Sequence, residues 1–66
     1  MKAFEFMIIY QPSEESREKG EKAAILVERQ TVLAASEREV TLKAAKLIPD
    51  AYADKLDELE VAVRPF

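Results

Sequence analysis

Residues 36–66 read SEREVTLKAAKLIPDAYADKLDELEVAVRPF, and this stretch decides the fold. Ser36 is followed three residues later by Glu39, which is the capping-box spacing that opens a helix. Apolar residues then recur with the i, i+4, i+7, i+8 spacing of a helix that buries one face: Val40, Ala44, Leu47 and Ile48. Pro49 ends the pattern, because proline cannot continue a helix. The sequence therefore predicts a helix that begins after Ser36 and ends before Pro49.

The C-terminal part of this stretch predicts a short helix followed by a strand. Tyr52, Leu56 and Leu59 form a second apolar stripe, which predicts a short helix over residues 50–58. Residues 59–64 then alternate as the side chains of a strand do.

The first strand is predicted over residues 4–11 and stops at Pro12, which cannot donate to a sheet ladder. Its even positions form one large apolar face, made of Phe4, Phe6, Ile8 and Tyr10. Its odd face is also partly apolar, because Met7 and Ile9 lie on it. A strand that is apolar on both sides is typical of the middle of a sheet.

Two further segments connect this strand to the helix. Residues 13–22 contain no apolar side chain, so they predict a solvated, mobile connection with at most a turn of helix. Residues 24–33 are rich in β-branched and aliphatic side chains and predict a second strand. Its apolar register is irregular near Arg29 and Gln30, where we expect a bulge or bend.

Together these elements predict one small α+β domain over residues 1–66, in the order strand, strand, helix, short helix, strand. The first two strands should be antiparallel, and the helix should return the chain so that the third strand runs parallel to the second. A right-handed connection then gives the sheet order 2-1-3, with the first strand in the centre. We expect the helix to pack on the first and third strands, with Leu47→Ala costing about 2–4 kcal/mol.

Composition argues against several classes of function. The chain has no cysteine and no histidine, which excludes disulfides, a structural zinc site and histidine-based acid–base catalysis. Its only glycine is Gly20, so a glycine-rich phosphate loop is also excluded. Its serine and threonine hydroxyls have no base to activate them. We therefore expect no catalytic activity and no bound cofactor.

Charge and hydropathy narrow the choice of partner. The net charge is −3, and no concentrated basic face of the kind that binds nucleic acid is visible. No apolar run approaches the ~20 residues that a membrane span needs. These features predict a soluble cytoplasmic protein that binds neither nucleic acid nor membrane.

The conspicuous charged cluster consists of Asp50, Asp54, Asp57, Glu58 and Glu60. On a helix, Asp50, Asp54 and Asp57 would share the face opposite the apolar stripe. Three interpretations stay open: a solvated face, a contact surface for a basic protein partner, and a carboxylate site for a divalent metal ion in a metal-dependent enzyme. The second would make Asp50, Asp54, Asp57 and Glu58 partner-binding residues.

Met7 and Ile9 suggest a second contact surface. One helix can cover only one face of a three-stranded sheet, so the other face would leave these two side chains beside water. We expect a second copy of the chain, giving a homodimer, or another protein partner to cover them. The alternative is that residues 50–58 or 13–22 fold over that face in a monomer.

Four segments share a pattern: 31–36, 44–45, 47–49 and the Glu-Val-Ala-Val-Arg-Pro-Phe terminus at 60–66, all within residues 31–66, about half of the chain. They resemble segments of small uncharacterised proteins encoded by tailed bacteriophages. The resemblance implies a viral origin and a non-enzymatic role, and it assigns no functional residues. The resulting hypothesis is a protein–protein interaction module, acting as an accessory protein that binds a host protein in the bacterial cytoplasm. A small structural component of the virus particle is the alternative.

Overall fold

A three-stranded antiparallel sheet forms the base of the structure, which is a computed structural model describing residues 1–66. Its strands are β1 (Lys2–Tyr10), β2 (Ala24–Ala34) and β3 (Leu59–Pro65). Their order in the sheet is β2-β1-β3, and both outer strands run antiparallel to β1. The predicted order and the central place of the first strand are therefore confirmed.

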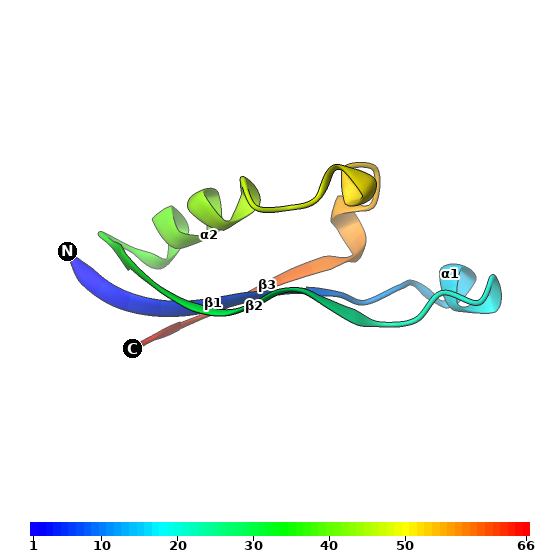
Figure 1. Cartoon of the computed structure of the whole chain (residues 1–66), viewed down its shortest axis with the longest axis horizontal. Helices are drawn as coiled ribbons and strands as arrows, with labels where there is room; N and C mark the ends of the chain where they lie inside the picture. The colour runs from blue at the N-terminus through cyan, green and yellow to red at the C-terminus, as the bar shows by residue number, and fades with distance from the viewer.

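Helical elements lie on one face of this sheet and at one end of it (Figure 1). The longest is α2 (Glu37–Ala45), which lies across the face and contacts all three strands. Two 3₁₀ turns, η1 (Asp50–Tyr52) and η2 (Leu56–Glu58), lead from α2 to β3. A single turn of helix, α1 (Glu14–Glu18), lies within the β1–β2 connection, at the right-hand end of the molecule in Figure 1. No element covers the opposite face of the sheet (Figure 1).

The core lies between β1 and α2. The even-numbered side chains of β1 from Phe4 onward are all buried, with at most 5% of each exposed: Phe4, Phe6, Ile8 and Tyr10. Val40 and Ala44 of α2 are fully buried against them, together with Ala34 at the end of β2. The strand alternation and the first half of the helical stripe are confirmed.

The predicted cap of α2 is present in a slightly extended form. The Ser36 hydroxyl oxygen accepts a hydrogen bond from the backbone N–H of Glu39 at 3.3 Å. The Glu39 carboxylate reaches back one residue further than in the usual capping box, and accepts from the backbone N–H of Ala35 at 3.2 Å. Lys43 lies 3.1 Å from the same carboxylate, and its hydrogen bond is the main cause that lowers the pKa of Glu39.

The prediction that the C-terminal half of the helical stripe is buried is wrong at Leu47. The helix ends at Ala45, and Leu47 is 46% exposed. From Lys46 onward the backbone N–H groups bond to the carbonyl three residues back, so the α-helical phase that predicted a buried Leu47 is lost. Ile48 is partly buried against the core, as expected. Leu47 therefore does not contribute the core packing assigned to it from the sequence.

Residues 50–58 do not form one helix. They make two separate 3₁₀ turns, and Asp54 lies between them. The shared helical face predicted for Asp50, Asp54 and Asp57 is therefore absent. The ring of Tyr52 packs on the ring of Tyr10 with centroids 5.1 Å apart, and this contact holds η1 against the end of β1.

The irregularity expected in the second strand is present. Phe6 pairs with Gln30, whereas Ile8 pairs with Val27, so β2 contains one residue more than β1 between these pairs. A second shift follows between Ile8 and Ile9. Such bulges increase the local twist of the strand that carries them.

Substitutions at Val40 and Leu47 separate the predicted core from the observed one. Val40→Ala should lower the free energy of unfolding by about 2 kcal/mol, because it removes two buried methyl groups and leaves a cavity. Leu47→Ala should cost less than about 1 kcal/mol, because that side chain is half exposed. Chemical denaturation of the two variants measures both values. An equal or larger loss for Leu47→Ala would contradict the packing described here.

Candidate interaction surfaces

The uncovered face of the sheet, called here the open face, carries the odd-numbered side chains of β1. Met7 and Ile9 are only partly buried on it. The register places Ala62 and Glu60 of β3 opposite Met7 and Ile9, and Ile25 of β2 on the other side of Ile9. Ile25 is 58% exposed. The placement of Met7 and Ile9 on a face that the chain's own helices do not cover agrees with the sequence analysis.

A carboxylate at the centre of the open face joins the three strands. Glu5 of β1 lies 3.5 Å from the Arg29 guanidinium of β2 and 3.0 Å from the Arg64 guanidinium of β3. The Glu5 side chain is only 17% exposed, whereas both arginine side chains are more than 60% exposed. Exposed ion pairs contribute little to stability, so the arginines stay available for a further anionic group.

A depression of ≈ 220 Å³ lies on this face. Its lining includes Met7, Ala62 and the three residues of the Glu5–Arg29–Arg64 cluster. Small-molecule sites usually enclose about 300–1,000 Å³ and bury most of the ligand. The depression is below that range and open, so it suits a side chain of another protein better than a free metabolite.

At the other end of the molecule, four side chains tie the β1–β2 connection to residues 50–58. Tyr10 donates a hydrogen bond to the carboxylate of Glu21, and Lys55 binds the second oxygen of that carboxylate at 2.9 Å. The Lys55 ammonium group also lies 5.5 Å from the ring centroid of Tyr10 and 5.7 Å from that of Tyr52. We call Tyr10, Glu21, Tyr52 and Lys55 the aromatic clamp.

The hydrogen bonds of the aromatic clamp shift the pKa values of its members in the direction that preserves the contact. The hydrogen bond with Glu21 raises the pKa of Tyr10, which keeps the phenol protonated. The same bond, followed by the one from Lys55, lowers the pKa of Glu21. Sequence reasoning missed this cluster, because Glu21 and Lys55 lie 34 positions apart and neither belongs to a recognisable motif.

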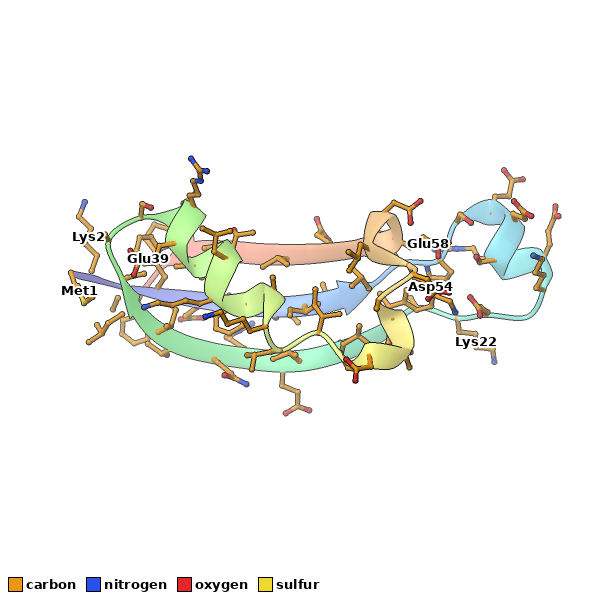
Figure 2. All side chains as sticks on the ribbon, turned by 90° about the horizontal axis from the view of Figure 1, so that it is seen from above. Met1, Lys2, Lys22, Glu39, Asp54 and Glu58 are labelled. Carbon is orange, nitrogen blue, oxygen red and sulfur yellow. The ribbon has the colours of Figure 1, made fainter.

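Glu58 belongs to a contact within the chain. Its carboxylate oxygen accepts hydrogen bonds from the backbone N–H of Ser13 and from the hydroxyl of Ser16, both at 2.8 Å. In Figure 2, Glu58 lies where η2 meets the start of α1. These hydrogen bonds, led by the one from Ser13, lower the pKa of Glu58. The sequence predicted Glu58 as a partner-binding residue, but the structure also gives it this anchoring role.

Asp50, Asp54 and Asp57 are exposed, and no group of three carboxylates comes together in a way that could hold a metal ion. They lie in what we call the acidic end, residues 11–22 and 50–60, which α1 and η2 bring together (Figures 1 and 2). The acidic end contains nine carboxylates and four cationic side chains, a formal charge of −5. The rest of the chain contains four carboxylates and six cationic side chains, a formal charge of +2.

Comparison with protein-family models, with curated proteins and with solved structures returned no match. The structure contains no helix that is both long and apolar enough to cross a membrane. The assignment of function therefore depends on the chemistry of the open face and of the acidic end.

Acidification should release α1 from η2. The pKa of Glu58 lies below its ordinary value of 4.5, so its carboxylate stabilises this contact above that pH, and the stabilisation is lost as the pH falls through the lowered value. The backbone amide resonance of Ser13 in a pH titration by NMR should report this transition. Glu58→Gln should abolish the transition, whereas Glu18→Gln, at an exposed position of α1, should leave it in place. A titration of Ser13 that persists in Glu58→Gln would contradict the assignment.

Proposed function

We propose that this chain is a non-enzymatic protein–protein interaction module. The observation that carries the proposal is the open face, where an apolar centre around Met7 and Ile9 has no cover from the chain itself. Complete burial of an aliphatic side chain of this size contributes about 1.5–3 kcal/mol, so covering several of them can drive association. The rim of this apolar centre is polar, which is the usual composition of a protein interface.

The acidic end supplies a second contact surface, for a basic protein partner. Asp50, Asp54 and Asp57 project from short turns and are free of contacts within the chain that would neutralise them. Clustered charge of one sign speeds the encounter with a partner of opposite sign and disfavours nonspecific association with nucleic acid. Glu58 contributes to the potential of this surface while it holds α1 in place.

The biological setting is part of the proposal. An accessory protein encoded by a tailed bacteriophage, acting on a host protein in the bacterial cytoplasm, fits a small chain with two contact surfaces. A structural component of the virus particle is the second candidate, and the open face favours it because copies can repeat through such a face. The exposed and separate positions of Asp50, Asp54 and Asp57 give no support to a metal-dependent enzyme.

The interaction module can be tested by passing bacterial host lysate over the immobilised chain and identifying the captured proteins by mass spectrometry. We expect wild type to retain a host protein, and we expect Asp54→Lys to lose it or release it at lower salt. Glu28→Lys is the matched control, because it makes the same charge change at an exposed position outside the acidic end. Ile9→Asp tests the open face in the same way.

The outcomes separate the candidates. Capture that depends on Asp54 or Ile9 supports the interaction module. Capture that none of the variants changes, or no capture at all, contradicts binding of a host protein through these surfaces. Presence of the chain in purified virus particles, with no host partner, would favour the structural component.

A further inference from the structure

On the open face, β3 carries one negative and one positive side chain at equal distances along the strand from Ala62. Glu60, Ala62 and Arg64 alternate along the strand on the open face, because they pair with Ile9, Met7 and Glu5 of β1. Ala62 is therefore flanked by a carboxylate two residues before it and a guanidinium two residues after it. A rotation of 180° about a line through Ala62 and across the strands would exchange these two charges.

We propose that the open face binds a second copy of this chain in a two-fold dimer whose axis crosses the strands at Met7 and Ala62. The interface of a two-fold dimer is formed by the same surface on both copies, so the surface must complement itself under the rotation. Here the rotation brings Arg64 of one copy over Glu60 of the other, twice. It also brings Met7 onto Met7 of the other copy, and it places Ile9 over Glu5 of the other copy, because Ile9 and Glu5 lie two residues on either side of Met7.

The distribution of charge over the whole chain selects the same arrangement. An axis across the strands makes the two copies antiparallel, so the acidic end of each, at −5, lies toward the +2 remainder of the other. An axis along the strands would instead place the two acidic ends together. Like charges brought together disfavour association, whereas complementary potentials favour it. The antiparallel arrangement is therefore the one that charge favours.

The size of the face predicts a reversible dimer. Nine residues of β1 at about 3.3 Å each span about 30 Å, and three strands with their side chains cover a width of about 15 Å. Each copy then contributes about 450 Å² of flat area, or about 900 Å² for the pair, close to the lower limit of specific interfaces. Such an area is typical of weak association, with exchange between monomer and dimer.

This inference rests on the proposed function, because it names the protein that covers the open face. The first test is sedimentation velocity over a series of protein concentrations. Wild type should dimerise reversibly, and Ile9→Asp should weaken the dimer by at least about tenfold, since it places a second carboxylate opposite Glu5 of the other copy. Dimerisation through a free sheet edge would be insensitive to Ile9→Asp, because Ile9 lies on the central strand.

Exchanging the charges of Glu60 and Arg64 tests the orientation of the two copies in the dimer. Both residues are exposed, so this test needs no substitution in the central strand. Glu60→Arg alone should fail to dimerise, because two guanidinium groups then meet at each contact, and Arg64→Glu alone should fail because two carboxylates meet. An equal mixture of the two variants should form a heterodimer, in which each contact pairs opposite charges. The matched controls are Glu37→Arg and Arg38→Glu, which make the same charge changes at exposed positions of α2, on the covered side of the sheet. Each control should dimerise as wild type does.

Three results would overturn the inference: a wild-type chain that stays monomeric at every concentration, a dimer unaffected by Ile9→Asp, or a mixture of charge variants that forms no heterodimer. Circular dichroism of each variant establishes that it is folded. If the chain is monomeric but capture of a host protein is still lost in Ile9→Asp, the proposal that a second copy covers the open face is wrong, and the interaction module stands. If capture is also unaffected by both Ile9→Asp and Asp54→Lys, the interaction module fails as well.

Discussion

Every other feature of the structure depends on the burial of one face of β1. Phe4, Phe6 and Ile8 provide most of the large apolar side chains of the core, and the fully buried Val40 holds α2 against them. Because β1 is the central strand, this contact also fixes β2 and β3 on either side through the backbone ladders. A chain with so small a core has little stability to lose, so one cavity in this contact weakens the whole domain.

The same constraint creates the open face. A chain of 66 residues provides one helix of useful length, and that helix covers only one side of the sheet. The strand that anchors the core therefore carries Met7 and Ile9 on its other side, beside the Glu5–Arg29–Arg64 cluster. Core formation and exposure of the open face are two consequences of one central strand with two apolar faces.

The contacts at the acidic end have a different role, since they hold the connections in place. The aromatic clamp fixes the end of the β1–β2 connection on residues 50–58, and Glu58 fixes the start of α1. These are polar contacts at the surface, so they respond to pH and salt, whereas the core contact between β1 and α2 does not. The geometry of the acidic end is therefore more adjustable than that of the open face.

The sequence by itself determined the strands, the start of the helix, the sheet order and the exposure of Met7 and Ile9, because these follow from local side-chain periods and from a single helix. Only the tertiary structure decided where α2 ends, how residues 50–58 divide into two turns, and which carboxylates form hydrogen bonds within the chain. Leu47 fits a helical period, but the backbone changes its hydrogen-bond spacing before that position. Glu21 and Glu58 find partners 34 and 45 positions away, and nothing in the sequence near either residue specifies such long-range contacts.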